Sequence, residues 1–303
     1  MTLQHTRLWA AATTLAGLLA AGVAQAADLG GSIKDGPAPK AEEKRACALS
    51  ANVALASQYV FRGFSQTGEH AALQGGIDAT CGRFYAGFWG SNLDFGGRID
   101  PVTGAVKDVA DIEIDWYAGI KHDFGRAEVD LGVIYYTYPA AFDRRFAADP
   151  VLLGLRELDY VELKLSTKWK LRDDFVVTTT GFYSPEYTNK TGSVITTEAG
   201  FEYTLPKAGR FSPAISALVG WQVGDADRYK TLIGNGTDSY LYWNAGVTIG
   251  FHEKFSLDLR YWDTNIDNNS TKLLGANNFC DGKVNGGVFQ CDSRFVATLK
   301  ATW

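Results

Sequence analysis

Residues 110–121 read Ala-Asp-Ile-Glu-Ile-Asp-Trp-Tyr-Ala-Gly-Ile-Lys. Apolar side chains occupy every second position of this stretch, at Ile112, Ile114, Trp116, Ala118 and Ile120. The polar side chains Asp111, Glu113, Asp115 and Lys121 stand on the other face. Successive side chains of a β-strand point to opposite faces, so this alternation predicts a strand with one apolar and one polar face.

The same alternation recurs along the chain, for example in 158–169, 254–263 and the C-terminal stretch. We therefore expect about twelve strands. They are placed near 50–62, 70–80, 83–92, 110–121, 126–138, 157–169, 173–184, 193–205, 211–223, 238–251, 254–265 and 291–303.

The links between these strands alternate in length. The short links are 81–82, 122–125, 171–173, 206–210 and 252–253, and the longer ones are 63–69, 93–109, 139–156, 185–192, 224–237 and 266–290. Tight periplasmic turns and longer external loops alternate in this way in bacterial outer-membrane barrels. The sequence therefore predicts an all-β, transmembrane, antiparallel up-and-down barrel.

The N-terminus has the pattern of an export signal. Arg7 precedes an apolar run from Leu8 to Val23, and Ala24-Gln25-Ala26 forms a small-x-small cleavage pattern. We interpret 1–26 as a signal peptide removed after Ala26. A membrane-spanning helix is the weaker alternative, because the run is short of the roughly 20 apolar residues it needs. Residues 27–49 are then a polar periplasmic segment and 50–303 the outer-membrane barrel.

Composition limits the partners. The chain of 303 residues has a formal net charge of −5, and a nucleic-acid partner usually needs a basic patch. We expect no nucleic-acid partner and no cofactor or metal. The expected partners are outer-membrane lipid and lipopolysaccharide, the outer-membrane assembly machinery and small solutes, with the oligomeric state open between monomer and trimer.

The four cysteines form two local pairs. If the first hairpin turns near Phe64, Cys47 lies across from Cys81 at the periplasmic rim, while Cys280 and Cys291 bracket a Gly-rich stretch of the last external loop. An even count in an exported protein predicts disulfides, Cys47–Cys81 and Cys280–Cys291. A metal site is the alternative, but the chain contains no CxxC motif.

Aromatic side chains are expected near both strand ends, as in the interfacial belts of a barrel. Tyr59, Phe61, Tyr135, Tyr183, Trp243 and Tyr261 are assigned to the external belt, and Trp169, Tyr203, Phe251 and Trp303 to the periplasmic one. The last strand carries Phe295 and ends in Trp303, which resembles the signal read by the assembly machinery.

The first strands resemble a known family. Residues 49–67, Leu-Ser-Ala-Asn-Val-Ala-Leu-Ala-Ser-Gln-Tyr-Val-Phe-Arg-Gly-Phe-Ser-Gln-Thr, are similar to the opening signature of the TorF family of porins, also catalogued as Gcw_chp. Residues 73–76, 84–95 and 113–119 resemble its next blocks, whereas the links 139–156 and 266–290 are longer than its pattern. The resemblance implies a pore but carries over no substrate or catalytic residue.

Polar side chains on the inward face are candidates for lining a lumen. They are Gln58, Arg62, Asp78, Glu113, Asp115, Asp130, Glu162, Lys164, Lys168, Glu198, Glu202, Asn244, Asp258, Arg260 and Lys300. They indicate a porin-like channel for passive diffusion of small hydrophilic solutes or ions in the outer membrane of a Gram-negative bacterium. Acids outnumber bases in this set, so any pore is predicted to favour cations. The alternative is that the charges pair and fill a narrow barrel.

Arg62 and Gly63 stand where the first strand leaves the membrane. Arg62 is interpreted as a structural arginine paired with an inward acid such as Asp78 or Glu113, with an anion-binding role at the mouth as the alternative.

Two other function classes remain. A barrel hydrolase would need Ser65, Glu69 and His70, but a Ser/His/acid set within one short hairpin rarely has the required geometry. We therefore expect no enzyme activity and no catalytic residue. A non-conducting barrel that acts as a surface scaffold or adhesin is the stronger alternative to a channel.

Overall fold

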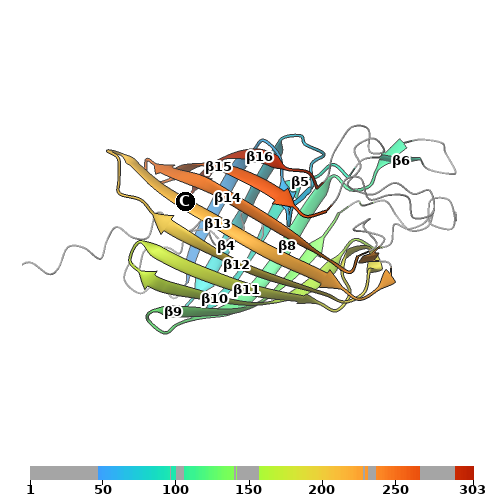
Figure 1. Cartoon of the computed structure of the whole chain (residues 1–303), viewed down its shortest axis with the longest axis horizontal. Coiled ribbons are helices and arrows are strands. Elements are labelled where there is room, and N and C mark those ends of the chain that lie inside the picture. The colour runs from blue at the N-terminus through green and yellow to red at the C-terminus, as the bar shows by residue number, and fades with distance from the viewer. Residues whose placement is uncertain are drawn as a thin grey trace, which may run out of the picture.

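The structure, a computed structural model, describes residues 47–95, 97–99, 106–139, 141, 157–227, 229–230, 237–266 and 291–303. The predicted signal peptide, most of the N-terminal segment and Cys280 lie outside these residues. Twelve antiparallel strands form a closed barrel in the order β1-β16-β15-β14-β13-β12-β11-β10-β9-β8-β5-β4 (Figure 1). The predicted fold class is confirmed.

The strand bounds agree with the sequence prediction at most ends. The barrel strands are β1 (Ala48–Ala56), β4 (Ala72–Cys81), β5 (Phe84–Asn92), β8 (Ile112–Asp123), β9 (Ala127–Thr137), β10 (Tyr160–Arg172), β11 (Phe175–Ser184), β12 (Val194–Thr204), β13 (Phe211–Gly224), β14 (Ser239–Phe251), β15 (Phe255–Thr264) and β16 (Arg294–Thr302). The 3-10 turn η2 (Thr188–Lys190) lies between β11 and β12.

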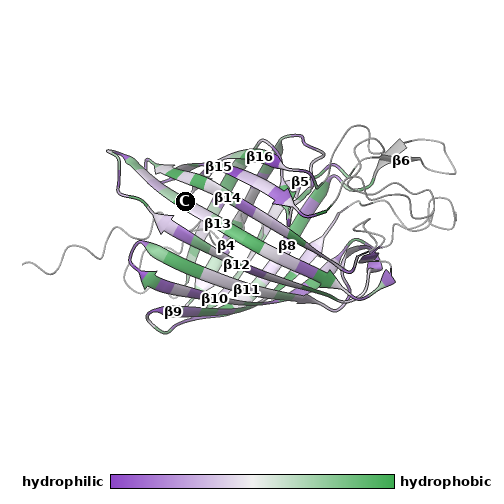
Figure 2. Ribbon diagram, viewed as in Figure 1, coloured by the Kyte–Doolittle hydropathy of each residue, from purple (hydrophilic) through white to green (hydrophobic). Residues whose placement is uncertain are grey.

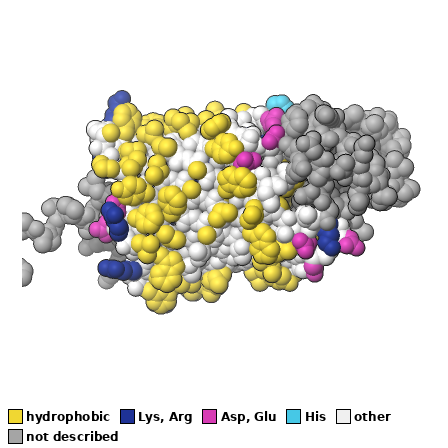
Figure 3. Space-filling model, viewed as in Figure 1, with side chains coloured by type: hydrophobic (Ala, Val, Ile, Leu, Met, Phe, Trp, Pro, Cys, Tyr) yellow, Lys and Arg dark blue, Asp and Glu magenta, His cyan; other side chains and the backbone are white. Residues whose placement is uncertain are grey.

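The two faces of the wall differ as the alternation predicts. Hydrophobic side chains such as Leu131, Leu165 and Leu259 are about half exposed on the outer surface. Hydrophobic and hydrophilic residues alternate along the strands in Figure 2. In Figure 3 hydrophobic side chains cover the middle of the visible outer wall, and charged ones gather toward its two ends. A belt of this kind places the strands across a bilayer.

The connections also alternate as predicted. Links of two to six residues join β4 to β5, β8 to β9, β10 to β11, β12 to β13 and β14 to β15, and longer links join the other sequential pairs. One long link carries the small hairpin of β6 (Gly97–Ile99) and β7 (Val106–Asp108), which Figure 1 shows at the end of the barrel away from the short turns. We call this the external end. Among the described residues, no helix is long and apolar enough to cross a membrane.

The prediction for the first strand was wrong at its external end. The expected strand was 50–62, but β1 ends at Ala56 and the chain then turns back into the barrel. Here β2 (Val60–Phe61) and β3 (Phe64–Ser65) form a hairpin that pairs with itself and with no wall strand. We call residues 58–67 the inner hairpin.

The disulfide at the opposite rim matches the prediction. Cys47 and Cys81 are bonded, with a sequence separation of 34 residues, and β1 pairs with β4 directly above them. Cys291 is also disulfide-bonded. Because Cys280 lies outside the described residues, the pairing Cys280–Cys291 stays a prediction.

Candidate functional site

The tip of the inner hairpin is tied to the opposite wall by an ion pair. Both terminal nitrogens of Arg62 donate hydrogen bonds to the two carboxylate oxygens of Glu162 on β10, each at 2.8 Å. The Tyr136 hydroxyl donates to the same carboxylate at 3.0 Å. The side chains of Arg62 and Glu162 are each only 1% exposed. A two-pronged guanidinium–carboxylate contact fixes geometry as well as charge.

The conformation of the tip makes this contact possible. Phe61 pairs with Phe64, so Arg62 and Gly63 are the two turn residues, with φ of 49° and 87°. Two positive φ values are typical of the tight turn that joins hairpin strands. A side chain at Gly63 would also overlap the Thr264 methyl group, so only glycine lets the turn approach the wall this closely.

Further contacts hold the guanidinium and the turn backbone. The Arg62 guanidinium carbon lies 4.7 Å from the ring centres of both Phe61 and Phe182, within the range of cation–π attraction. The Arg62 carbonyl accepts a hydrogen bond of 3.1 Å from the Tyr240 hydroxyl on β14. The tip is therefore held from several sides of the barrel.

The first arm of the inner hairpin is also fixed to the wall. The Tyr59 hydroxyl donates to Glu113 on β8 at 2.9 Å, and its ring lies edge-on to Trp89. The Gln58 side-chain oxygen accepts from Arg294 on β16 at 3.1 Å. The hydrogen bonds of Tyr59 and Gln58 each satisfy a buried polar group of the inner hairpin.

Tyrosines extend the packing toward the external loops. Tyr160 stacks on Tyr136 with ring centres 4.3 Å apart, and Tyr187 meets Tyr160 at 4.7 Å. Tyr229, in the link after β13, contacts Tyr187 and donates to Gln222 at 3.1 Å. The aromatic rings thus form a continuous cluster between the hairpin and the loops.

The two loop tyrosines of this cluster stay neutral. Burial raises the pKa of Tyr229, and the neighbouring Tyr187 phenol raises it further. Burial also raises the pKa of Tyr187, although the positive charge of Arg62 partly opposes that shift. Both phenols therefore remain protonated at physiological pH and can act as hydrogen-bond donors.

Side chains fill the barrel at the level of the inner hairpin. The wall residues that face inward there are all buried: Ala56, Ala72, Trp89, Glu113, Asp115, Tyr136, Glu162, Thr196, Gln222, Tyr242 and Trp262. Among the described residues, none of these side chains exceeds 4% exposure. The external end is therefore closed by packing at this level.

The half of the barrel near the short turns is more open. Inward-facing Asp78, Lys168, Thr178 and Asp258 are half-buried and the Lys121 side chain is 38% exposed, whereas Asn52, Asp130, Glu202 and Lys300 in the same half are buried. An inward side chain can be reached by solvent only through the lumen or the barrel end. The periplasmic half of the interior is therefore polar and in part accessible to water, and we call it the vestibule.

One charged cluster in this vestibule centres on Asp130. Its carboxylate accepts from the Tyr85 hydroxyl at 2.7 Å and lies 2.9 Å from the Lys164 ammonium. Lys121 approaches the same carboxylate at 3.8 Å, and both lysines lie over the Tyr85 ring. The Asp130 carboxylate is therefore approached by two lysines on this side of the vestibule.

A second cluster centres on Arg260. Its guanidinium donates to Asp258 at 2.9–3.0 Å, to the Asn244 side-chain oxygen at 2.7 Å and to Ser216 at 2.9 Å. Thr248 donates to the same Asp258 carboxylate. The arginine therefore links three neighbouring strands on the inner face of the wall.

Every residue in the predicted lumen set is buried or half-buried in the structure. The set is nevertheless divided by depth: Gln58, Arg62, Glu113, Asp115, Glu162 and Glu198 stand at the filled external level, and the others line lower levels of the interior. The predicted pairing of Arg62 with an inward acid is confirmed, although the acid is Glu162 and neither of the two examples, Asp78 and Glu113. Asp78 accepts from Tyr117 and Glu113 accepts from Tyr59, while Arg62 binds Glu162.

Two aromatic assignments were also wrong. Tyr59 and Phe61 were expected on the lipid-facing belt, but Tyr59 is 1% exposed and Phe61 packs against Tyr136 inside the barrel. Both belong to the inner hairpin. The remaining exposed aromatic side chains, such as Tyr135, Tyr183 and Trp169, lie on the outer face as expected.

Sequence reasoning missed the inward tyrosines as a group. Near the external strand ends, inward tyrosines alternate with outward side chains. They are Tyr136, Tyr160, Tyr240 and Tyr242, and the available signal was that each occupies an inward position of the two-residue alternation. An amphipathic ring suits either a lipid interface or a polar interior. Position along the strand therefore could not show by itself that these tyrosines face inward. The inner hairpin that they contact had to be known as well.

The structure separates the residues considered for a hydrolase. Ser65 is buried, donates to Gln58 and accepts from the Glu69 backbone amide. His70 is exposed and contacts Asp94 at 3.2 Å. Within the described residues, these contacts show no nucleophile–base pair between Ser65 and His70.

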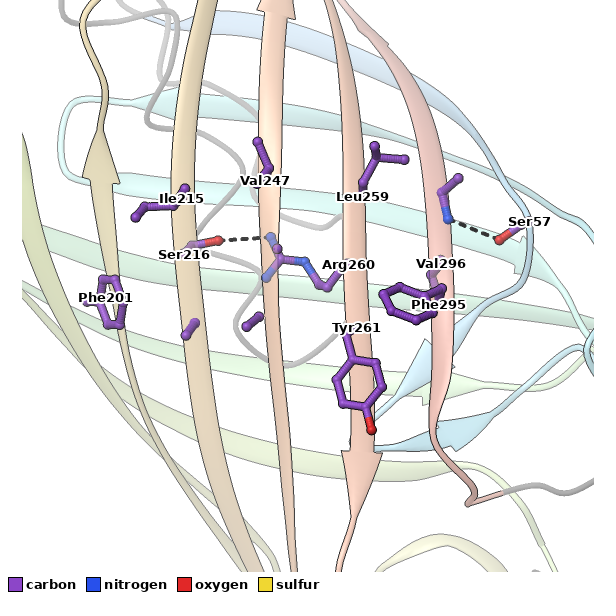
Figure 4. A pocket seen from close by; sticks show the side chains of 14 residues that line it. Ser57, Phe201, Ile215, Ser216, Val247, Leu259, Arg260, Tyr261, Phe295 and Val296 are labelled. Carbon is purple, nitrogen blue, oxygen red and sulfur yellow. Dashed lines mark hydrogen bonds between the residues drawn. The ribbon is translucent and has the colours of Figure 1, made fainter.

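A depression of about 700 Å³ lies at the wall of β13 to β16. Figure 4 shows outward side chains such as Phe201, Leu259 and Phe295 around it, and Arg260 reaching across β14 to Ser216. Register places Ala217 beside Ala245 at its centre, where small side chains leave the surface low. The depression is mainly a feature of the apolar wall and adds nothing to the vestibule.

A closed antiparallel barrel with an apolar belt outside and polar groups inside defines the class of transmembrane β-barrels. Within that class, the chain belongs to the Gcw_chp family, described as bacterial proteins of unknown function, whose model matches residues 40–303. This confirms the Gcw_chp part of the resemblance. The TorF designation stays a prediction.

Several solved outer-membrane proteins are similar in fold. The KdgM porin in complex with disordered oligogalacturonate has 8% identity and a TM-score of 0.49, covering 84% of this chain and 99% of the porin. The NanC porin has 8% identity and a TM-score of 0.44, covering 84% and 98%. Outer-membrane expressed OmpT of Vibrio cholerae has 11% identity and a TM-score of 0.36, covering 86% and 99%. No curated protein matches the chain.

Proposed function

We propose that the protein is a porin-like channel of the Gram-negative outer membrane, which passes small hydrophilic solutes or ions by passive diffusion. The observation that carries this proposal is the polar, water-accessible vestibule inside an apolar wall. The Lys121 side chain is 38% exposed there although it faces the interior, so water reaches the periplasmic end of the lumen beside it. A polar interior of this kind suits hydrated solutes.

The route to the membrane is part of the same proposal. Residues 1–26 would direct export and be removed, and 27–49 would remain in the periplasm. Phe295 and Trp303 are 79% and 58% exposed, so the assembly machinery could read them without disturbing the interior. Lipid and lipopolysaccharide would then cover the belt. The family resemblance supports a TorF-type porin, and none of the contacts above supports an enzyme.

Charge pairing modifies the expected selectivity. Glu162, Asp130 and Asp258 are each neutralised by a basic partner, so the excess of acids in the predicted set overstates the negative field. The Asp130 cluster has two lysines within reach. We propose that the vestibule itself is close to neutral.

A non-conducting surface scaffold is the second candidate. The filled level around the inner hairpin favours it, because solutes cannot cross a packed layer of buried side chains. A scaffold of this kind would present its external loops to partners and would leave the vestibule as a closed-ended pocket.

Planar-bilayer recording of the refolded protein tests the channel. Stepwise current openings are expected, and the reversal potential under a salt gradient reports the ion preference. Heat-dependent gel mobility verifies that the same sample is folded. A folded barrel that stays silent at every voltage and under variants that loosen the inner hairpin would leave the scaffold as the function.

A further inference from the structure

The inner hairpin is a separate unit between the external mouth and the vestibule. Its strands pair only with each other, and the barrel is already closed by β1 and β4 without them. Its connections to the wall are mainly side-chain contacts: Arg62 with Glu162, Tyr59 with Glu113, Gln58 with Arg294, and Tyr240 with the Arg62 carbonyl. Removing it from the lumen would therefore break no strand pairing of the barrel.

We propose that the inner hairpin is the gate of the channel and that the Arg62–Glu162 pair is its latch. This inference rests on the proposed channel function and adds the closed state, the moving part and the residues that hold it. In the closed state Arg62 and its neighbours fill the external level. In the open state the hairpin swings toward the external side, and the vestibule becomes continuous with the outside.

The energetics of the latch favour a reversible contact. The attraction between two buried charges is largely offset by the loss of their hydration. When the hairpin moves out, water reaches both Arg62 and Glu162 and restores that hydration. Closed and open states can then be close enough in free energy for both to be populated to a measurable extent.

The chain around the hairpin contains suitable hinge positions. Ser57 remains on the wall, since its backbone amide donates to the Ala297 carbonyl on β16 at 2.8 Å. On the return side, Gly68 and Glu69 have φ of 55° and 68° and lead to β4. A few residues that absorb large changes in φ and ψ are sufficient for hinge motion.

Removing one partner of the latch should open the gate. Glu162→Gln keeps the size of the side chain but leaves the Arg62 charge without a counter-charge inside the barrel. The charged guanidinium then gains by moving into water, so the open state should become more populated. Since hydrogen bonds to charged groups contribute about 1.5–3 kcal/mol, the open population should rise at least about tenfold.

A cysteine below the gate measures this population without relying on ion flow. Thr178 faces inward on β11, two inward positions deeper than Phe182, which touches Arg62. In intact cells that lack general porins, a small membrane-impermeant maleimide should label Thr178→Cys slowly in the parent protein. The labelling rate should rise about tenfold with Glu162→Gln, in proportion to the open population.

Three controls define the labelling assay. Asp227→Cys stands fully exposed on the external side and should be labelled at one rate in all backgrounds. Lys207→Cys stands in an exposed periplasmic turn and should stay unlabelled while Glu162 is unchanged, which shows that the reagent reaches the periplasm by no other route. Arg172→Gln removes the exposed ion pair with Asp174 in another turn, so it should leave labelling of Thr178→Cys unchanged.

Two further variants keep the test informative if Glu162→Gln folds poorly. Tyr240→Phe removes only the hydrogen bond to the Arg62 carbonyl and should raise the labelling rate by a smaller factor. The charge exchange Arg62→Glu with Glu162→Arg should return the rate toward the parent value, because the pair is restored in reverse.

The outcomes separate the gate from the channel. Faster labelling together with more frequent current openings supports both. Currents that are present but insensitive to Glu162→Gln, with unchanged labelling, overturn the gate and leave the channel. Faster labelling without current in any variant supports the moving hairpin and overturns the channel. Unchanged labelling in folded Glu162→Gln and Tyr240→Phe overturns the gate.

Discussion

At the scale of single residues, packing of the interior depends on glycines, whose lack of a side chain lets a neighbouring ring lie close to the backbone. The Tyr242 ring lies directly over Gly220 on the neighbouring strand β13, and its hydroxyl donates to Glu198 on β12. A β-carbon on Gly220 would overlap the ring. The glycine therefore lets one tyrosine bridge three strands and carry the filled level toward β12.

Gly220→Ala should lower the free energy of unfolding by about 1–3 kcal/mol, since the added methyl group must displace the Tyr242 ring from a packed interior. Gly181→Ala is the matched control, because nothing lies within 4 Å of the position where its β-carbon would be. Urea unfolding in lipid vesicles, followed by tryptophan fluorescence, compares the two. Equal stability of both variants would show that the ring moves freely.

At the scale of elements, each strand of the wall has one face toward lipid and the other toward the polar interior of the barrel. Leu165 is 50% exposed and stands midway along β10, whereas Leu171 is on the same face near the periplasmic turn. The apolar belt predicts that the cost of a charged substitution depends on the depth of the position in the membrane, and not only on its burial within the protein.

Leu165→Arg should cost about 2–4 kcal/mol of unfolding free energy, because it places a charge at the middle of the bilayer. Leu171→Arg should cost no more than about 1 kcal/mol, as its charge reaches the headgroups. Unfolding titrations in vesicles measure both. Similar costs at the two depths would contradict the placement of β10 across the membrane.

The Cys47–Cys81 disulfide constrains the first two wall strands. Closing a loop with a sequence separation of 34 residues restricts the unfolded chain. Cys47→Ser with Cys81→Ser should therefore lower stability by roughly 2–4 kcal/mol. Non-reducing peptide mapping should recover this pair together with the predicted Cys280–Cys291 pair. Recovery of Cys47 linked to either other cysteine would refute the register at the rim.

At the scale of the whole molecule, closure is what makes the sheet compatible with lipid. β1 pairs with both β4 and β16, so the first and last wall strands leave no free edge. Each unpaired backbone group would cost several kcal/mol in hydrocarbon. The C-terminal strand thus completes the hydrogen bonding of the entire barrel.

Trp303→Ala should separate assembly in cells from folding itself. The Trp303 side chain is 58% exposed, so its loss removes little packing, and purified protein should refold in detergent with unchanged heat-dependent gel mobility. In cells the amount of folded barrel should fall, because the terminal aromatic residue is the proposed assembly signal. Normal amounts in cells would remove that role from Trp303.

Three features of the sequence were sufficient to predict the wall of the barrel: the alternation along the strands, the lengths of the links and the spacing of the cysteines. The pattern in 110–121 gives β8 its faces, the alternation of links gives an even strand number, and Cys47 lies opposite Cys81 as their spacing predicts. These features are local, because each depends on neighbouring strands or on the period of side-chain direction.

The inner hairpin could be identified only from the tertiary structure. Residues 57–62 alternate well enough to continue β1, so periodicity alone could not show that the chain turns inward after Ala56. The partner of Arg62 is 100 residues away on β10 and becomes its neighbour only when the sheet closes. Contacts across a lumen have no sequence period, and for that reason only the folded barrel decided what closes its external end.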